Sequence, residues 1–231
     1  MDGTAAIFHT ANDGASWTEQ GNPELWQGMN GNDISAVDAW TAWAALGDEA
    51  NNVGMILHTT DGGTTSKSQA LPNGVNVPVK EIKGLSKKVA WAVTLGGTVM
   101  RTLDGGDNWN LDAPNITGDN DIDDICAVGE DIAWAAQNVD VGGNIIRVRM
   151  VDGKAVCDVM DPMQNNYHFE GVTCFNENNL WVVGFKAFGA AERLPLGVIL
   201  HTRDGGKTWT SQKVPTSDVN LWKVSFAGAF R

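Results

Sequence analysis

Positive charge is scarce in this sequence. Of its 231 residues, 16 are Lys or Arg and 28 are Asp or Glu, which gives a formal net charge of -12 at pH 7. A surface of this kind repels nucleic-acid phosphates and anionic lipid headgroups. We therefore expect no nucleic-acid partner and no membrane insertion, and instead a neutral or basic partner, either a protein or a glycan.

Long apolar runs are also missing, since no stretch approaches the roughly 18 apolar residues of a membrane-spanning helix. Residues 1–10 lack the charged and apolar regions of a signal peptide, although a leader removed before Met1 is compatible with this start. The chain as given is therefore expected to be soluble.

Only three cysteines occur, at Cys126, Cys157 and Cys174, and they form no CxxC pair. This excludes a dense disulfide framework and a structural zinc site. Two interpretations remain. We favour small buried strand residues over one disulfide with a free thiol.

Tryptophan and glycine are abundant by contrast, with ten Trp against one Tyr, and 27 Gly. Together with 42% hydrophobic residues, this composition favours a substantial core built from many short strands joined by tight turns.

An internal repeat organises these residues. In each repeat two apolar strands come first, and the second strand carries Trp43, Trp91, Trp134 or Trp181, at spacings of 48, 43 and 47 residues. A third strand follows, ending in a turn of the form Thr-x-Asp/Asn-x-Gly, and then a fourth strand. Alternating strands and Gly-rich turns with this period are typical of β-propeller blades.

We predict an all-β, single-domain β-propeller over residues 1–231, with about five four-stranded blades. The approximate blade boundaries are 31–78, 79–121, 122–168, 169–220, and 221–231 plus 1–30. The repeat between 125 and 171 is degenerate and offers only Asp152-Gly153 as a turn.

The closing blade, shared between the two termini, has no Trp-bearing second strand in the sequence. Either 227–231 or 1–4 improvises this strand, a second molecule supplies it, or the chain is a segment of a longer propeller.

The four turns resemble Asp boxes, also called BNR repeats, of sialidases, xyloglucanase-type glycosidases, sortilin-type receptors and photosystem II assembly and stability factors. The last group is the most similar in its Trp-bearing strand and its DGGxTW ending. The matching residues are Thr10, Asn12, Gly14 and Trp17; Thr59, Asp61 and Gly63; Thr102, Asp104, Gly106 and Trp109; and Thr202, Asp204, Gly206 and Trp209. The resemblance implies a propeller, structural Asp residues and an extracytoplasmic or secreted location.

The chemistry of these residues is that of a turn. Gly supplies a positive φ, the carboxylate accepts backbone N–H groups, and the Thr hydroxyl closes the network. We expect no catalytic residue here. His9, His58 and His201 share one repeat position and are interpreted as structural strand residues.

The sequence gives little support to an enzymatic function. A sialidase-like site would need clustered arginines, but Arg101, Arg147 and Arg203 fall on or beside the third strands. A glycosidase needs only two carboxylates, and the loops hold many, but solvated loop acids explain them equally well. A glycoside hydrolase therefore remains the enzyme alternative to a non-catalytic chain.

One acidic run could bind calcium. Asp119, Asp121 and Asp123 supply oxygen ligands at alternating positions, although Asp124 stands where an EF-hand loop needs Gly. A looser Ca²⁺ site and a plain solvated loop are both open; no other cofactor is expected.

The loops before the first strand and after the second strand of each repeat remain as the expected partner face. Their aromatic and basic residues are suited to stacking on a sugar or anchoring a peptide, although some could simply plug the funnel. They are Trp26, Tyr167, His168, Phe185, Lys186, Phe188 and Arg193. The predicted function is a non-catalytic binding or assembly scaffold, with a lectin-like propeller as the alternative.

Overall fold

The computed structural model describes residues 5–113, 121–139, 142–162, 167–186, 196–215 and 219–225, and these form two compact units, Met1–Leu111 and Asp112–Arg231. The N-terminal unit contains β1 (Phe8–His9), β2 (Thr18–Glu19), the 3-10 turn η1 (Pro23–Trp26), β3 (Asn30–Ala36), β4 (Ala42–Asp48), β5 (Val53–Thr59), β6 (Lys67–Gln69), β7 (Val79–Gly84), β8 (Ala90–Thr94) and β9 (Val99–Thr102). The C-terminal unit contains β11 (Ile122–Ala127), β12 (Ile132–Val139), β13 (Gly142–Val151), β14 (Lys154–Met160), β15 (Tyr167–Cys174), β16 (Leu180–Lys186), β17 (Gly197–Thr202) and β18 (Thr210–Gln212). Strand β10 (Asn110–Ala113) spans the boundary.

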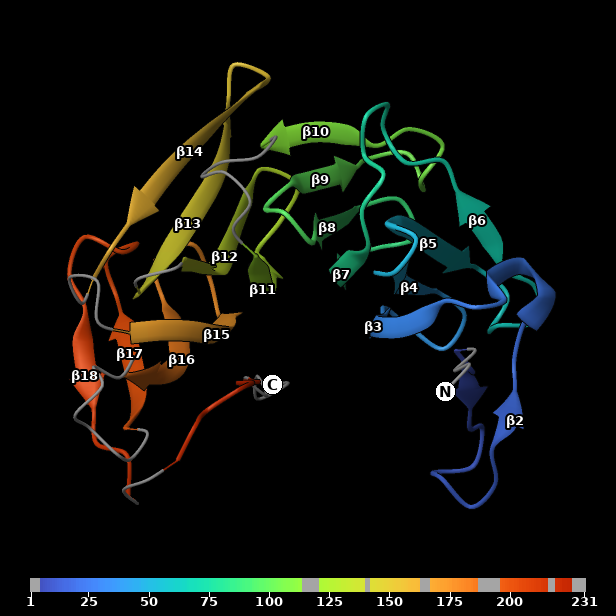
Figure 1. Ribbon diagram of the computed structural model, residues 1–231, viewed down its shortest axis with the longest axis horizontal. Coiled ribbons are helices and arrows are strands. Elements are labelled where there is room, and N and C mark those ends of the chain that lie inside the picture. Colours follow the sequence, from blue (N-terminus) through green and yellow to red (C-terminus); the bar gives the residue numbers. More distant parts are fainter. Residues whose placement is uncertain are drawn as a thin grey trace. The chain divides into compact units, whose positions relative to one another are not determined.

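These strands form four four-stranded sheets, each with its strands in chain order: β3–β6, β7–β10, β11–β14 and β15–β18 (Figure 1). A separate two-stranded sheet pairs β1 with β2. The chain is thus an all-β propeller of about five blades, as the repeat predicts, with four complete blades. The shared closing blade and the single domain stay predictions, and residues 1–4 and 227–231 lie outside the described residues.

One stacking arrangement recurs in every complete blade. The Trp of the second strand lies directly opposite a flat cationic or imidazole side chain on the third strand. The ring centroids are 3.6 Å apart for Trp43 and His58, and 4.2 Å apart for Trp181 and His201. Arg101 and Arg147 lie 5.1 and 5.4 Å from the rings of Trp91 and Trp134 in the other two blades. The structural interpretation of His58 and His201 is therefore confirmed.

The same Trp also packs on the following blade. Trp43 donates through Nε1 to the Ser86 carbonyl at 3.2 Å and meets Trp109 edge-on at 6.0 Å. Gly84 lies directly beneath the indole, so close that a Cβ at this position would come within 2.5 Å of the ring. Fully buried, Trp43 links two blades into one apolar cluster.

The four repeat turns share one hydrogen-bond pattern. In the blade β7–β10, Thr102 Oγ1 donates to Asp104 Oδ1 at 2.9 Å and accepts from Gly106 N at 2.9 Å. The same Asp104 oxygen accepts from Asn108 N, and the other oxygen accepts from its side-chain amide. The remaining turns repeat these contacts around Asn12, Asp61 and Asp204.

These hydrogen bonds hold the pKa of three turn carboxyls below the ordinary value, with the side chain four residues later as the largest cause. For Asp204 the Thr208 hydroxyl leads, and the pKa falls to about 2. The carboxylates thus accept hydrogen bonds that stabilise the turns. Trp209 Nε1 donates to the Gly206 carbonyl of its turn at 3.1 Å and Trp109 is buried, whereas Trp17 is 61% exposed.

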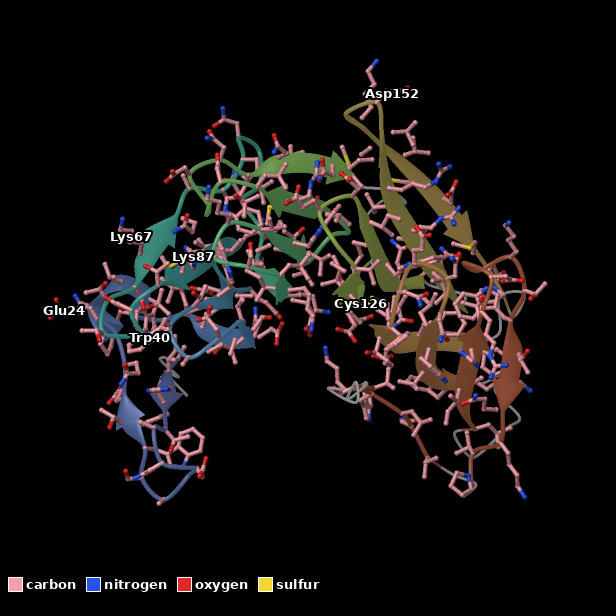
Figure 2. All side chains as sticks on the ribbon, turned by 180° about the vertical axis from the view of Figure 1, so that it is seen from behind. Glu24, Trp40, Lys67, Lys87, Cys126 and Asp152 are labelled. Atoms are coloured by element: carbon pink, nitrogen blue, oxygen red, sulfur yellow. A yellow bond between two sulfur atoms is a disulfide. The ribbon has the colours of Figure 1, made fainter. Side chains whose placement is uncertain are left out.

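Cys126 and Cys174 form a disulfide between β11 and β15, so the favoured expectation of unpaired strand cysteines is wrong for these two (Figure 2 labels Cys126). Cys157 is a free thiol. At the equivalent positions of the preceding blade pair, Ser35 Oγ accepts a hydrogen bond from Gly84 N at 3.0 Å. The disulfide therefore replaces a hydrogen bond between neighbouring first strands.

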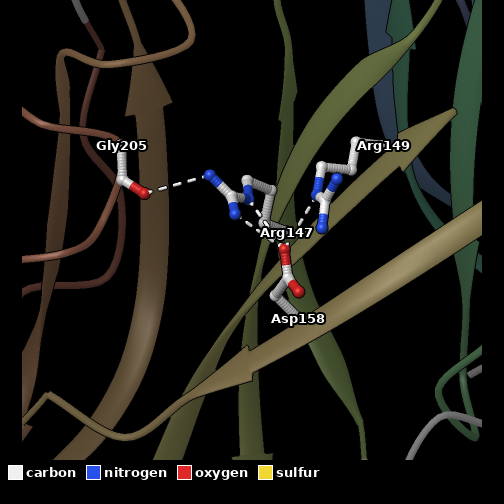
Figure 3. Close-up of polar contacts among 4 residues, drawn as sticks. All are labelled: Arg147, Arg149, Asp158 and Gly205. Carbon is white, nitrogen blue, oxygen red and sulfur yellow. Dashed lines mark hydrogen bonds and ion pairs between the residues drawn. The ribbon is translucent and has the colours of Figure 1, made fainter. Parts of the chain in front are cut away.

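The degenerate blade turns at Asp152 and Gly153, both at positive φ, as expected. Its long hairpin is held by an ion-pair cluster in which Asp158 accepts from Arg147 at 2.7 Å and from Arg149 at 3.0 Å (Figure 3). Arg147 also donates to the Gly205 carbonyl in the turn of the next blade, at 3.2 Å. It therefore serves as a structural link at the turn end of this unit.

Candidate partner-binding site

Four of the predicted partner-face residues lie together at one end of the blade β15–β18. Tyr167 pairs with Lys186 and His168 pairs with Phe185 where β15 begins and β16 ends. Two loops that are separate in the sequence are thus joined by strand register. All four side chains are half-buried. Phe188 and Arg193, expected on the same face, lie outside the described residues.

An aromatic row crosses this end of the blade. The rings of His168 and Phe185 stack with centroids 5.3 Å apart, and Phe185 meets Trp222 at 5.8 Å. Trp222 leaves 58% of its surface exposed. We call His168, Phe185 and Trp222 the aromatic row.

Glycines allow the segment 219–225 to reach the row. A Cβ on Gly171 would come within 3.0 Å of Lys223 Cα and 3.1 Å of the Trp222 carbonyl. A Cβ on Gly197 would come within 3.0 Å of the Val219 carbonyl. Since backbone approaches backbone at both points, a side chain at either position would push the segment 219–225 outward.

An ion pair between the buried Asp124 and the exposed Lys223 fixes the same segment. Asp124 accepts from Val172 N at 2.9 Å, from Ile125 N at 3.0 Å and from Lys223 Nζ at 3.1 Å. Burial raises the pKa of Asp124, and the attraction of Lys223 opposes this rise. Lys223, the residue after Trp222, is thus tied to β11.

Two carboxylates lie in the same unit on neighbouring first strands. The Asn138 side-chain amide donates to Asp123 at 2.7 Å and to Glu170 at 3.0 Å, and its oxygen accepts from Phe169 N. Glu170 was not singled out by the sequence. The repeat could have identified Glu170, because it occupies the repeat position of Asp123, one repeat later.

Trp26 was predicted on the partner face, and this prediction is wrong. It is fully buried, donates through Nε1 to the Ala5 carbonyl at 2.8 Å and packs against Leu46 and Leu57. The turn η1, capped by the Asn22 side chain on Glu24 N, folds it inward. Its indole therefore presents no surface to a partner.

The calcium hypothesis gains no support from the described residues, where no three His, Cys, Asp or Glu side chains are placed to hold a metal ion. Asp119 lies outside them. Asp123 accepts a hydrogen bond from Asn138.

Across the same part of the chain, no helix is long and apolar enough to cross a membrane.

No protein-family model matches the sequence, and no curated protein matches it. Among solved structures, the chain is similar to an ancestral GH74 enzyme, with a TM-score of 0.66 and 14% identity over 97% of this chain and 31% of that one. The chain is also similar to the GH74 enzyme of Niastella koreensis, with a TM-score of 0.61 and 13% identity over 89% of this chain and 34% of that one. For the structure of YCF48 bound to a D1 peptide, the TM-score is 0.48 and the identity is 18%, over 96% of this chain and 79% of that one. The chain spans about a third of the GH74 enzymes, and the likeness to them confirms the predicted propeller fold.

Proposed function

We propose that this chain is a non-catalytic propeller that binds a protein partner through the aromatic row. The observation that carries the proposal is the exposure of Trp222, 58%, on a row of rings held in place by two glycines and an ion pair. A rigid, exposed aromatic side chain loses little conformational freedom on binding and is typical of interface hot spots.

The chemistry around the row indicates the kind of partner. Tyr167 and Lys186 flank the rings, while Asp123 and Glu170 add negative charge to the same unit. Together with a net charge of -12, this favours a neutral or basic polypeptide segment that places an apolar side chain on Trp222.

The repeat turns and the disulfide extend the proposal. We assign the four turns as Asp boxes with a structural role, because the carboxylates of Asp61, Asp104 and Asp204 and the side-chain amide of Asn12 are engaged within the turns. The Cys126–Cys174 disulfide supports an oxidising, extracytoplasmic location.

Selection from a random peptide library displayed on phage tests the proposal. We expect the intact chain to enrich peptides with an apolar or aromatic side chain and basic flanks, and Trp222→Ala to lose this enrichment. Trp17→Ala, which removes another exposed Trp, is the control and should enrich the same peptides.

A glycan array with the same three proteins tests the lectin alternative, because an exposed indole also stacks on sugar rings. Glycan binding that requires Trp222, without peptide enrichment, would replace the protein-binding proposal. Hydrolysis of chromogenic glycosides by the intact chain would favour the enzyme alternative instead.

A further inference from the structure

The hairpin β1–β2 corresponds to half a blade. Its turn, around Thr10 and Asn12, matches the turns that join the third and fourth strands of complete blades. In every complete blade the third strand pairs with a second strand on its other side. Among the described residues, β1 pairs with β2 alone.

The hairpin nevertheless occupies a regular blade position within the N-terminal unit. A Cβ on Gly63 would collide with Gln20, just as a Cβ on Gly106 would collide with Gln69 at the equivalent place. The hairpin therefore sits on the blade β3–β6 as β6 sits on the next blade. Because the hairpin is placed regularly, the position of a second strand beside β1 is defined.

That position is an apolar groove of about 290 Å³. It is lined on one side by Ile7, Phe8 and His9, and on the other mainly by residues of β3, β4 and the turn between them. Trp40, 66% exposed and labelled in Figure 2, is part of the lining. Phe8 exposes 54% of its surface.

The floor of the groove lacks the cover that its repeat equivalents have. Ile34 is 54% exposed, whereas Ile82 and Val172, at the same repeat position, are 2% and 3% exposed. Ile82 is covered by Trp43 and Ala45 of the preceding second strand, in the pattern Trp-x-Ala. Trp134 and Ala136 cover Val172 in the same way.

The groove also provides a seat for an indole. His58 and His201 stack on the Trp of their second strands, but His9, their equivalent, is exposed and no ring stacks on it among the described residues. At the repeat position of Trp109, the groove has the small residue Ser66. At the repeat position of Gly84 it has Ala36, which is smaller than Cys174, the residue that packs at this position against the cluster of Trp134.

We propose that this groove accepts an extended segment of a partner protein that carries Trp-x-Ala or Trp-x-Val and adds to β1 as an antiparallel second strand. The Trp stacks on His9, the small residue two positions later covers Ile34, and main-chain hydrogen bonds form along the edge of β1 that lies opposite β2. Basic residues flanking the motif suit the net charge of -12. The site lies in the other unit from the aromatic row, so it is independent of the proposed function.

Binding of a synthetic peptide to the full chain tests this proposal. The peptide KKAWAVTKK copies Ala90–Thr94 between lysines, and its Trp→Ala form keeps all the charge. We expect binding of the first peptide by fluorescence anisotropy, and binding at least about tenfold weaker for the second. His9→Ala and Ile34→Ser should each weaken binding several-fold, whereas Trp17→Ala should leave it unchanged.

Because His9 and Ile34 are exposed, neither replacement should disturb folding, and unchanged thermal unfolding midpoints confirm this. Absence of binding, or equal binding of both peptides, overturns the proposal. So does a chain that dimerises in solution and dissociates on Ile34→Ser, since the occupant is then a second copy rather than a partner protein.

Discussion

Loss of the Cys126–Cys174 disulfide should lower the free energy of unfolding by up to about 4 kcal/mol. The two cysteines are 48 residues apart. Closing a loop of that length removes about 14 cal/mol/K of entropy from the unfolded chain, or about 4 kcal/mol at 25 °C. This value is an upper limit, because residual structure in the unfolded chain reduces it.

The repeat supplies a matched pair of variants. In Cys126→Ser/Cys174→Ala, the new hydroxyl can accept from the backbone N–H of residue 174, as Ser35 accepts from Gly84. Cys126→Ala/Cys174→Ala cannot form this bond. We expect the first variant to be more stable than the second by about 1 kcal/mol, the usual net value of one hydrogen bond.

Urea unfolding of the intact chain and both variants measures these differences, with Cys157→Ala in every background to prevent thiol exchange. Alkylation counts the thiols, and the unfolded, unreduced wild-type chain should expose one. Three reactive thiols in that sample, or equal unfolding midpoints with and without reductant, would refute the reasoning.

Three further predictions concern the turns and the blade contacts. Asp104→Ala removes three hydrogen bonds from an exposed turn and should cost about 1–2 kcal/mol, or roughly 3–6 °C in Tm, without changing partner binding; loss of binding by the folded variant would contradict a structural role. The pKa values of Asp61, Asp104 and Asp204 are lowered by folding, so their contribution is complete above the unfolded pKa near 3.8 and is lost as pH falls towards 2. Urea midpoints between pH 6 and 2 should show this loss, and Asp204→Asn, which copies Asn12, should flatten it; an unchanged pH profile would count against the turn assignment. Gly84→Ala drives a Cβ into Trp43 and should destabilise the chain by about 1–3 kcal/mol, whereas Gly31→Ala, which meets only an ordinary contact with Ala5, should not; equal melting temperatures would argue against the packing of Trp43 on that glycine.

The sequence predicted the elements that repeat. Trp43 and the Asp104 turn recur with one period, and repetition identifies strands and turns even where a single segment is ambiguous. The stacking of His58 on Trp43 escaped notice because two blades use arginine at the same position. The shared feature is a flat polar side chain opposite Trp, which becomes visible only in the strand register.

Features that depend on neighbouring strands were harder to predict. Cys126 and Cys174 replace Ser35 and Gly84, so the repeat showed no conserved pair, although their separation of 48 residues matches one repeat. Trp26 lies in a loop that folds onto β4 and β5, and loop sequence carries little information on burial. Tyr167 and Phe185, which we predicted on one face, lie at the same end of a blade because both flank strands whose ends the repeat had already fixed.

The affinity of one selected peptide for three forms of the chain tests the central claim most directly. The account predicts that Trp222→Ala weakens calorimetric binding at least about tenfold, and that Trp17→Ala leaves it within about twofold of wild type. Equal affinities of the wild type and Trp222→Ala would contradict the assignment of the aromatic row as the partner-binding surface.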